Sequence, residues 1–578
     1  MTLGLADPQG DLFDDLNGFC ERTLPERSIY VLLARERDRL FPDGAFADLF
    51  TDRGRRSVPP SVVATVMVLQ RLEGCSDREA VERFCFDSRW RYAAGVGGYD
   101  TAGRTSFVHT VLVDMRERLR ASENPDRIFA SALAVASEAG LVGRKRAVDS
   151  TPLYDAVATM DTVTLIRSAI RSLLRVVDRT LAEQLRAAMS GRDDYASVAK
   201  PVIDWEDHSA REGLIDGCAK DARAALAVLD GRELDPAVEQ AGRLLATVTG
   251  QDLDEGSDGV FRIARRVAKD RVISTVDPEA RHGHKTAARG FDGYKGHVAL
   301  DPDSEIITAT TVSPGNTADG AVAEELIADL LGEGARDRGQ AETPEQPAAA
   351  DVSAAEDGDQ PVISEQPDAH AGAAPAGHHA SDGGGDDGEQ PATVYGDNAY
   401  GTGEFQDRLD QAGIDSRCKS QRPTAPGGLF TKDDFDVDLD SDAVTCPAGH
   451  TAPIRRGRDG AGIASFGALC AGCPLQAHCT TASTGRTISV GAHESALARA
   501  RARQAAPDWQ ADYRATRPKV ERKLAHLMRR KHGGRRARVR GKAKVDADFR
   551  LLAAATNLAR LAALGVRSTA LGWTAAIA

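Results

Sequence analysis

Cysteine is scarce in this chain, with nine in 578 residues, and aromatic residues make up only 5%. So low a cysteine density excludes a small disulfide-stapled scaffold, and a reducing compartment would keep the thiols free. The sequence also lacks an apolar run long enough to cross a bilayer, and its acidic start, MTLGLADPQG, lacks the basic region of a signal peptide. We therefore expect a cytoplasmic protein without a membrane segment, in which clustered cysteines would be candidates for metal binding.

An overall excess of positive charge is missing too, because the formal net charge is −13. Residues 333–391, however, contain 14 Asp or Glu and two Arg, so the rest of the chain sums to about −1. This acidic insert is poor in large apolar residues and is predicted to be disordered, because it cannot offset the entropy of ordering. Residues 514–550 have the opposite bias, with 15 Lys or Arg against three acids. They indicate either a polyanion-binding stretch or a solvated helical face.

The length of the chain predicts roughly two to four folding units. The first, residues 1–135, is predicted to be helical. Pro59 precedes apolar residues at helical spacing up to Gly74, and Ser76 with Glu79 forms a capping-box pattern before the next helix. Two helices joined by a short glycine-containing turn resemble a helix-turn-helix, whose second helix would enter a major groove. Plain helical packing is the alternative.

Residues 136–578 follow a different pattern. KRAVDSTPLY is typical of a strand, with Asp149 near its end, and residues 155–275 are predicted to form a helical insertion. GYKGHVAL and EIITATTV flank a turn-forming tetrapeptide and predict a hairpin, which a helix follows. ATVYGDNAYG predicts another strand, ending at Asp397, and a late helix carries Glu521. This order predicts a mixed α/β sheet with acids at strand ends, where open sheets place their sites.

Asp149, Asp397 and Glu521 are the acids with which such a sheet could build a phosphodiester-cleaving site. That chemistry must neutralise charge on the attacking and leaving oxygens, which two carboxylate-bound divalent ions achieve. Taken singly, each acid is also compatible with a cap or turn, and Glu521 with an ion pair to Arg517. Three further polar residues fall near the expected site, with a functional or a purely structural role: Lys295, His297 and Asp319.

Several motifs carry a family resemblance. They are SVVATVMVLQRLEGCSDREAVERF in the helical region, AVDST, GFDGYKGHVALD with SPGNTADG, YGDNAYG, and RPKVERKLAHLMRRKHGG. Together they make the chain, from about residue 10 to about residue 570, similar to insertion-sequence transposases of the DDE superfamily. The resemblance implies a ribonuclease-H-like catalytic core behind a helical N-terminal DNA-binding domain.

The resemblance also implies the site residues. Asp149 in AVDST, Asp397 in YGDNAYG and Glu521 in RPKVERK stand at the three catalytic acids, which would hold two Mg²⁺ or Mn²⁺ ions. Arg517 falls on the family's arginine one helical turn before the glutamate, which implies that it holds a DNA phosphate or the acid itself. Tyr513 lies one residue further upstream than the related Tyr-Arg-Glu-Lys signature expects.

Met528 occupies the lysine position of that signature, so the basic residues just beyond it become the candidate contacts to DNA. The expected DNA-binding residues are Arg517, Arg529, Arg530, Lys531, Arg535 and Arg536.

The implied function is that of a DNA transposase of a bacterial mobile element. It would bind the terminal inverted repeats of its insertion sequence and free a 3′-OH at the element end by hydrolysis. That hydroxyl would then make an in-line attack on target DNA. Its partners would be the element ends and target DNA, and joining two ends implies a homodimer or higher assembly associated with the nucleoid. Two alternatives are a metal-dependent nuclease without strand transfer and a non-catalytic DNA-binding protein descended from a transposase.

Four of the nine cysteines lie close together between the second and third acids. Cys446, Cys470, Cys473 and Cys479 include a C-x2-C pair and supply four thiolates at zinc-like spacing. We expect a structural zinc site in a small inserted knuckle over residues 445–485, with unligated buried thiols as the alternative.

Overall fold

The computed structural model describes residues 15–97, 106–156, 159–190, 193–266, 268–286, 289–332 and 391–576. Apart from Pro391, the acidic insert expected to be disordered lies outside the described residues. None of the described helices is both long and apolar enough to cross a membrane.

The N-terminal part is helical, as the sequence pattern predicts. Gly74 ends α3 (Pro60–Glu73) in the left-handed conformation, with φ 69°. The reciprocal capping box of Ser76 and Glu79 then starts α4 (Asp77–Phe86). Residues 60–71 are all buried, so α3 forms the centre of this unit. The other elements are α1 (Asp15–Thr23), α2 (Ile29–Leu40), η1 (Asp43–Leu49), α5 (Ser88–Ala93), α7 (Thr110–Ala121) and α8 (Arg127–Glu138).

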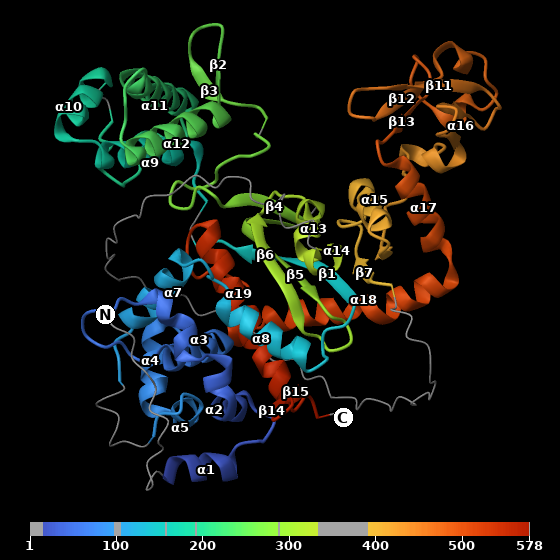
Figure 1. Ribbon diagram of the computed structural model, residues 1–578. Helices are drawn as coiled ribbons and strands as arrows, with labels where there is room; N and C mark the ends of the chain where they lie inside the picture. The colour runs from blue at the N-terminus through green and yellow to red at the C-terminus, as the bar shows by residue number, and fades with distance from the viewer. Residues whose placement is uncertain are drawn as a thin grey trace.

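A six-stranded mixed sheet forms the middle of the molecule (Figure 1). Its strands are β1 (Lys145–Tyr154), β4 (Arg281–Thr286), β5 (Arg289–Leu300), β6 (Ile307–Pro314), β7 (Thr393–Gly396) and β8 (Asp415–Cys418). β5 pairs antiparallel with β1, β4 and β6, whereas β7 runs parallel to both β1 and β8. The predicted mixed sheet is confirmed. The expectation for Asp149 is corrected, because β1 continues to Tyr154 and the acid lies within the strand.

Helices cover both faces of this sheet, because successive strand residues point to opposite sides. Ala147 of β1 packs in one cluster with Val520 and Phe549. The next residue, Val148, packs in another with Phe405. The helices concerned are α18 (Pro507–Leu527) and α19 (Lys542–Ala563) on the first face, and α13 (Ala323–Leu326) and α15 (Gly403–Gln411) on the second. The single helix expected after the hairpin is broken into η3 (Asp319–Val322), α13 and α14 (Ala328–Leu331).

Helix α19 belongs to two hydrophobic cores at once. Phe549 and Leu552 pack with the sheet, while Leu558 and Leu561 pack with the N-terminal helices. Figure 1 shows α19 between α3 and α8 on one side and β5 and β6 on the other. The C-terminal helix therefore joins the helical unit to the sheet.

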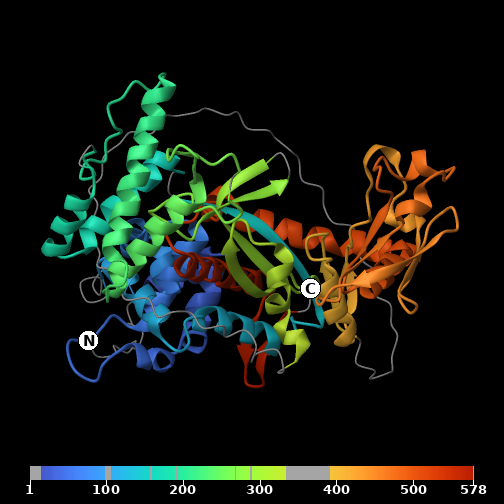
Figure 2. The same cartoon turned by 90° about the horizontal axis from the view of Figure 1, so that it is seen from above.

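Two further units flank the sheet at opposite ends of the molecule (Figure 2). Between β1 and β4, α9 (Thr162–Val176), α10 (Arg179–Ala188), α11 (His208–Leu229) and α12 (Pro236–Asp252) enclose a core of their own, with a small hairpin of β2 (Leu253–Glu255) and β3 (Phe261–Ile263). At the other end stands a five-stranded antiparallel sheet of β9 (Asp436–Asp438), β10 (Ala443–Thr445), β11 (Thr451–Arg456), β12 (Gly462–Ser465) and β13 (Thr487–Val490).

This five-stranded sheet replaces the expected zinc knuckle. Val444, Phe466 and Ile488 pack with Cys479 into an apolar core. Within the described ranges, no group of three or more His, Cys, Asp or Glu side chains is arranged to hold a metal ion. Zinc is therefore not supported, and apolar packing accounts for this unit. Its short helices are η5 (Pro426–Gly428), η6 (Lys432–Asp434), η7 (Gly467–Cys470) and α16 (Gln476–Cys479).

The chain leaves this unit through α17 (Glu494–Ala505) and enters α18, which returns to the central sheet. A basic loop containing η8 (Arg530–His532) connects α18 to α19, and a hairpin of β14 (Arg567–Thr569) and β15 (Gly572–Thr574) follows.

Candidate active site

Asp149 and Asp397 lie at the same level of the central sheet because their strands pair in parallel. In the register of β1 with β7, Ala147 is opposite Tyr395, and each aspartate comes two residues after its member of that pair. Local hydrogen bonds then orient both carboxylates. The backbone N–H of Ser150 donates to Asp149 (2.8 Å), and the amide two residues after Asp397 donates to that side chain (2.9 Å).

Helix α18 contributes the third acid and a guanidinium. Arg517 Nη2 lies 3.0 Å from Asp149 Oδ1 and 3.9 Å from Asp397 Oδ2. Arg517 Nη1 lies 3.6 Å from Glu521 Oε1. The Arg517 side chain is only 5% exposed, whereas exposure of the acids rises from 14% at Asp149 to 45% at Asp397 and 62% at Glu521. Acids from three distant segments thus meet on one guanidinium, with the innermost acid largely buried and the outer two open to solvent.

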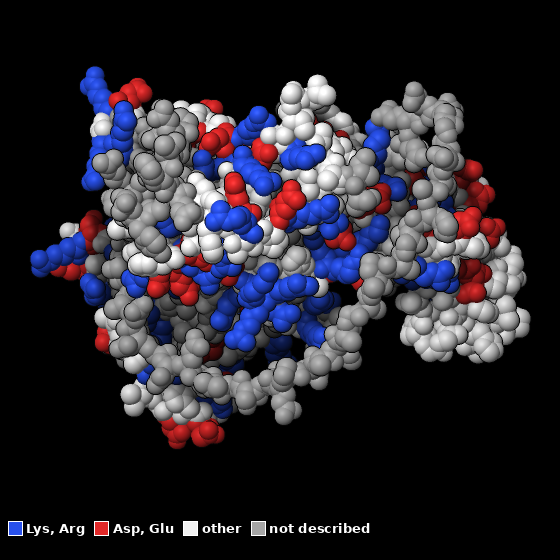
Figure 3. Space-filling view, turned by 90° about the horizontal axis from the view of Figure 1, so that it is seen from below, with Lys and Arg blue, Asp and Glu red and all other residues white. Residues whose placement is uncertain are grey.

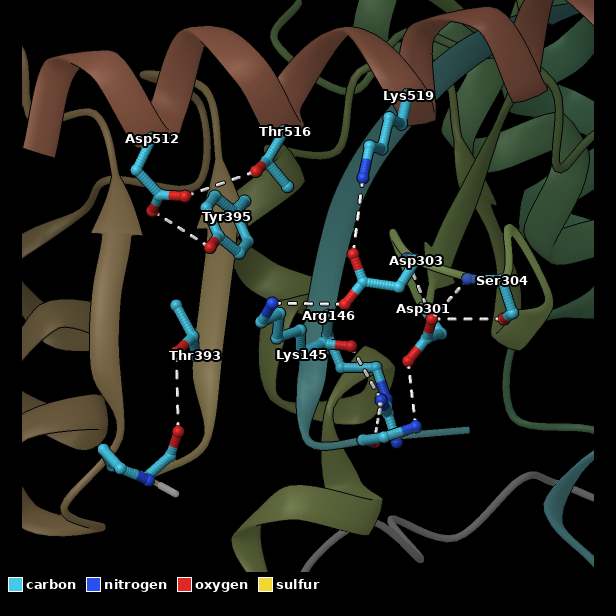
Figure 4. A network of polar contacts seen from close by, with 12 residues as sticks. Lys145, Arg146, Asp301, Asp303, Ser304, Thr393, Tyr395, Asp512, Thr516 and Lys519 are labelled. Carbon is cyan, nitrogen blue, oxygen red and sulfur yellow. Dashed lines mark hydrogen bonds and ion pairs between the residues drawn. The ribbon is translucent and has the colours of Figure 1, made fainter. Parts of the chain in front are cut away.

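Polar contacts hold α18 against the sheet (Figure 4). Asp512 accepts a hydrogen bond from the hydroxyl of Tyr395 on β7 (3.0 Å). Asp303, in the turn between β5 and β6, forms ion pairs with Lys145 of β1 (3.1 Å) and Lys519 of α18 (3.4 Å). The position of Glu521 relative to the aspartates therefore depends on contacts of α18 with β7 and with the β5–β6 turn, which is itself paired with β1.

Burial raises the pKa of Asp149 to about 6. The Arg517 guanidinium and the Ser150 amide oppose that rise, and the neighbouring charge of Asp397 adds to it. Because this pKa lies below neutral pH, Asp149 is mainly ionised there, with Arg517 as its counter-ion.

Lys295 and Asp319 lie behind Asp149, on the other face of the sheet. Ser150 is directly opposite His297 in the pairing of β1 with β5, and such partners share a face, so Asp149 points to the opposite one. Asp319 accepts hydrogen bonds from Ser150 (2.6 Å) and Lys295 (2.8 Å). Lys295 and Asp319 therefore support β1 at the acid site.

The His297 ring is fully buried in the same layer. It lies between the hydroxyls of Tyr400 (3.2 Å) and Ser313 (2.8 Å). Burial lowers the pKa of His297 to about 4, so the ring is neutral at physiological pH. Sequence reasoning did not single out Ser150 or Tyr400, although both stand in the acid-bearing motifs AVDST and YGDNAYG.

The three acids offer the oxygen donors that Mg²⁺ and Mn²⁺ prefer. A guanidinium lies among them, and in the described part of the chain no cluster of three acidic, His or Cys side chains is arranged to hold a metal ion. Arg517 Nε and Nη1 are buried without a hydrogen-bond partner, so the guanidinium is incompletely satisfied. The donor set fits divalent ions in type, and binding them requires Arg517 to give up part of its carboxylate contacts.

The residues expected to contact DNA differ in their surroundings. Arg517 is buried against the acids. The other five lie in the basic loop, residues 528–541 between α18 and α19, and are exposed. They are Arg529, Arg530, Lys531, Arg535 and Arg536. The Tyr154 N–H donates to the Arg535 carbonyl (3.0 Å), so this loop passes the end of β1. Figure 3 shows Lys and Arg gathered across the middle of one face of the molecule.

In a helix-turn-helix, α4 would be the helix that enters the major groove of DNA. Its exposed surface carries equal numbers of positive and negative side chains. Arg78 and Arg83 are exposed beside Glu79 and Glu82. The exposed basic loop is therefore a stronger candidate for DNA contact than α4.

The four clustered cysteines come together without forming a ligand set. All four line one small cavity of about 20 Å³. Cys470 Sγ accepts a hydrogen bond from the Arg486 N–H (3.3 Å), and Cys479 is buried in the apolar core. The spacing correctly indicated proximity, whereas metal binding finds no support in the geometry.

Three family models match the chain. A transposase domain model (DUF772) matches residues 19–118, and two models described as transposase DDE domains match residues 263–337 and 445–562. The chain belongs to the insertion-sequence DDE transposases. Searches of curated proteins and of solved structures found no significant match.

The matched regions show which parts of this transposase belong to the family's domains. The match over residues 445–562 contains the four clustered cysteines and strands β11, β12 and β13, together with α18 and nearly all of α19. Most of the five-stranded sheet therefore belongs to the transposase domain itself. Strands β1 and β7 lie outside all three matches. The assignment of Asp149 and Asp397 as catalytic acids therefore depends on the geometry of the site.

Proposed function

We propose that this transposase binds the terminal inverted repeats of its insertion sequence and catalyses metal-dependent DNA strand cleavage and strand transfer. The convergence of Asp149, Asp397 and Glu521 on one guanidinium carries the proposal. The strand pairing gives further support. Three antiparallel strands, β6, β5 and β1, continue into the parallel strands β7 and β8, which is the arrangement of a ribonuclease-H-like core.

Divalent ions, Mg²⁺ or Mn²⁺, bound by the three carboxylates would neutralise charge on the attacking and leaving oxygens. The residues of the chain position the reactants. Asp149 lies within β1, while Asp397 and Glu521 are more exposed, on the side from which a DNA strand would approach. Arg517, once it gives up carboxylate contacts, brings positive charge beside a phosphodiester. The reaction would free a 3′-OH at the element end and then join it to target DNA.

The exposed cations of the basic loop would hold the DNA backbone. Arg529, Arg530, Lys531, Arg535 and Arg536 lie close along the chain and are exposed, as phosphate contacts require. Joining two element ends requires two bound ends, which favours a homodimer or higher assembly.

A strand-transfer assay tests this proposal. Pre-cleaved element-end DNA is incubated with a plasmid target and Mg²⁺ or Mn²⁺, and joined products are measured. We expect Asp149→Asn and Asp397→Asn to lower joining by about 10³-fold, because several kcal/mol of charge stabilisation are lost, while end binding is retained. Asp114→Asn, at an exposed position on α7, is the matched control and should leave joining unchanged.

Other outcomes would contradict the proposal. Uncleaved element-end DNA is assayed in parallel. Its cleavage without joined products from either substrate would identify a nuclease, and end binding without any cleavage or joining would identify a DNA-binding protein.

A further inference from the structure

A cavity of about 270 Å³ lies where the N-terminal helices meet α19. Its walls come from α3, the start of α4, α7, the start of α8, the end of the basic loop and α19 itself, which Figure 1 shows grouped together. Small-molecule sites usually enclose about 300–1,000 Å³. At about 270 Å³ the cavity lies just below that range, which limits it to a small ligand such as a phosphate group with part of an attached nucleoside. No residue of the acid site lines it.

Each of the three acids that line this cavity is paired with an arginine that also lines it. The ion pairs are Asp77 with Arg116 (2.6 Å), Asp548 with Arg71 (3.1 Å), and Asp126 with Arg550. The two members of each pair neutralise each other. The net charge of the lining therefore comes from its other charged residues.

The lining carries six cations against three acids, because three other cations also line the cavity: Arg120, Arg538 and Lys544. They come from α7, the basic loop and α19 respectively. Arg538 donates a hydrogen bond to the carbonyl of Cys75, and its charge helps to lower the pKa of Asp77 and of Glu79. Arg120 is partly buried, and this burial lowers its pKa. Arg120 and Arg538 are partly buried and Lys544 is exposed. The excess of three positive charges around one space favours an anionic ligand.

The remaining wall is apolar. Leu119, Phe129 and Leu551 contribute to it from α7, α8 and α19. An apolar surface beside an excess of cations suits a ligand with an anionic group and a less polar body, as in a nucleotide.

We propose that this cavity is a binding site for a phosphate-bearing ligand, supplied either by a strand of bound DNA or by a free nucleotide. A phosphate there would contact the N-terminal helices and α19 at once, and so would join the two units that α19 already connects. The proposal does not depend on catalysis, because its test measures binding.

The test uses the full-length protein and three probes: inorganic pyrophosphate, dAMP, and a duplex carrying the element end. Arg120→Gln with Lys544→Gln removes two of the three excess positive charges. Ala547→Phe fills the cavity from α19 while keeping every charge. The matched control is Arg39→Gln with Arg211→Gln, which removes two exposed charges at positions distant from the cavity in sequence and outside its lining.

We expect at least one probe to bind the wild type, and both cavity variants to weaken that binding at least tenfold, with the control within about twofold. If DNA supplies the phosphate, the duplex alone shows this loss, and removing the two charges reduces the salt slope by up to about 1.8. If a free nucleotide supplies it, dAMP or pyrophosphate binds by itself. Because melting curves show which variants are folded, either cavity variant suffices. Binding of all three probes that is the same in a folded cavity variant as in the control would overturn the proposal.

Discussion

Arg517 contacts all three candidate acids, so its substitution should affect stability as well as chemistry. Arg517→Gln leaves ionised Asp149 without its counter-ion, and breaking a buried pair in this way costs about 3 kcal/mol. The folded pKa of Asp149, about 6, lies above its ordinary value of 3.8, so the cost of burying its charge is present at pH 8 and relieved as the pH falls through 6. Urea unfolding should therefore show a larger loss at pH 8 than at pH 5.

Arg517→Lys keeps the charge but not the planar fork, and should recover only part of the stability lost in Arg517→Gln. An equal loss for the glutamine variant at both pH values would contradict the role of Arg517 as counter-ion.

Lys523 on the same helix is only 4% exposed, and burial lowers its pKa from 10.5 to about 8. Below pH 8 the charged amine therefore destabilises the fold, and stability from this group rises between pH 8 and 10.5. Lys523→Met should raise the free energy of unfolding at pH 7 by about 1–3 kcal/mol. It should also flatten the pH dependence in that window. Glu305 keeps its ion pair with Arg522 (3.1 Å) in the variant. A less stable Lys523→Met protein at pH 7 would contradict this reasoning.

Helix α18 acts as a unit, because Glu521 reaches the aspartates only while the helix is docked on the sheet. Asp303 ties it to β1 through Lys519 and Lys145. Asp303→Ala should cost at most about 1 kcal/mol of stability, as for exposed pairs. Strand transfer should fall about 10- to 100-fold, because small misplacements of reacting groups are expensive.

Asp258→Ala provides the matched control for α18, since Asp258 forms a similarly exposed ion pair with Arg262 (2.8 Å) in the flanking helical unit. Equal transfer rates for the Asp258 and Asp303 variants would show that docking of α18 does not depend on this tie.

Charge across the protein divides between the acidic insert and the rest of the chain. Residues 333–391 contribute most of the net charge of −13 through their 14 acids. Replacing those acids by Asn and Gln should raise the affinity for DNA about tenfold at low salt, because repulsion of the phosphate backbone is removed. The gain should shrink at high salt, where the Debye length is short. An affinity gain independent of salt would point to a cause other than charge.

Local signals in the sequence were sufficient for the strongly patterned elements. Gly74 and the Ser76–Glu79 box delimit α3 and α4 because caps are satisfied within a few residues. The hairpin of β5 and β6 follows in the same way from its turn. The strands of the five-stranded sheet contain only three to six residues each, too few for a clear alternation of apolar and polar residues. The cysteine spacing is the stronger local signal in that segment, and it indicates a zinc site rather than a sheet.

Composition and local pattern determined on their own that this chain has helical and mixed α/β parts, an acidic insert, and acids in motifs suited to phosphodiester chemistry. Tertiary structure alone decided that Asp149, Asp397 and Glu521 meet on Arg517, that Lys295, His297 and Asp319 lie on the other side of β1, and that the cysteines pack in an apolar core. The reason is physical. Caps and turns are stabilised by interactions between neighbouring residues, whereas strand register and helix docking are set by contacts between segments hundreds of residues apart.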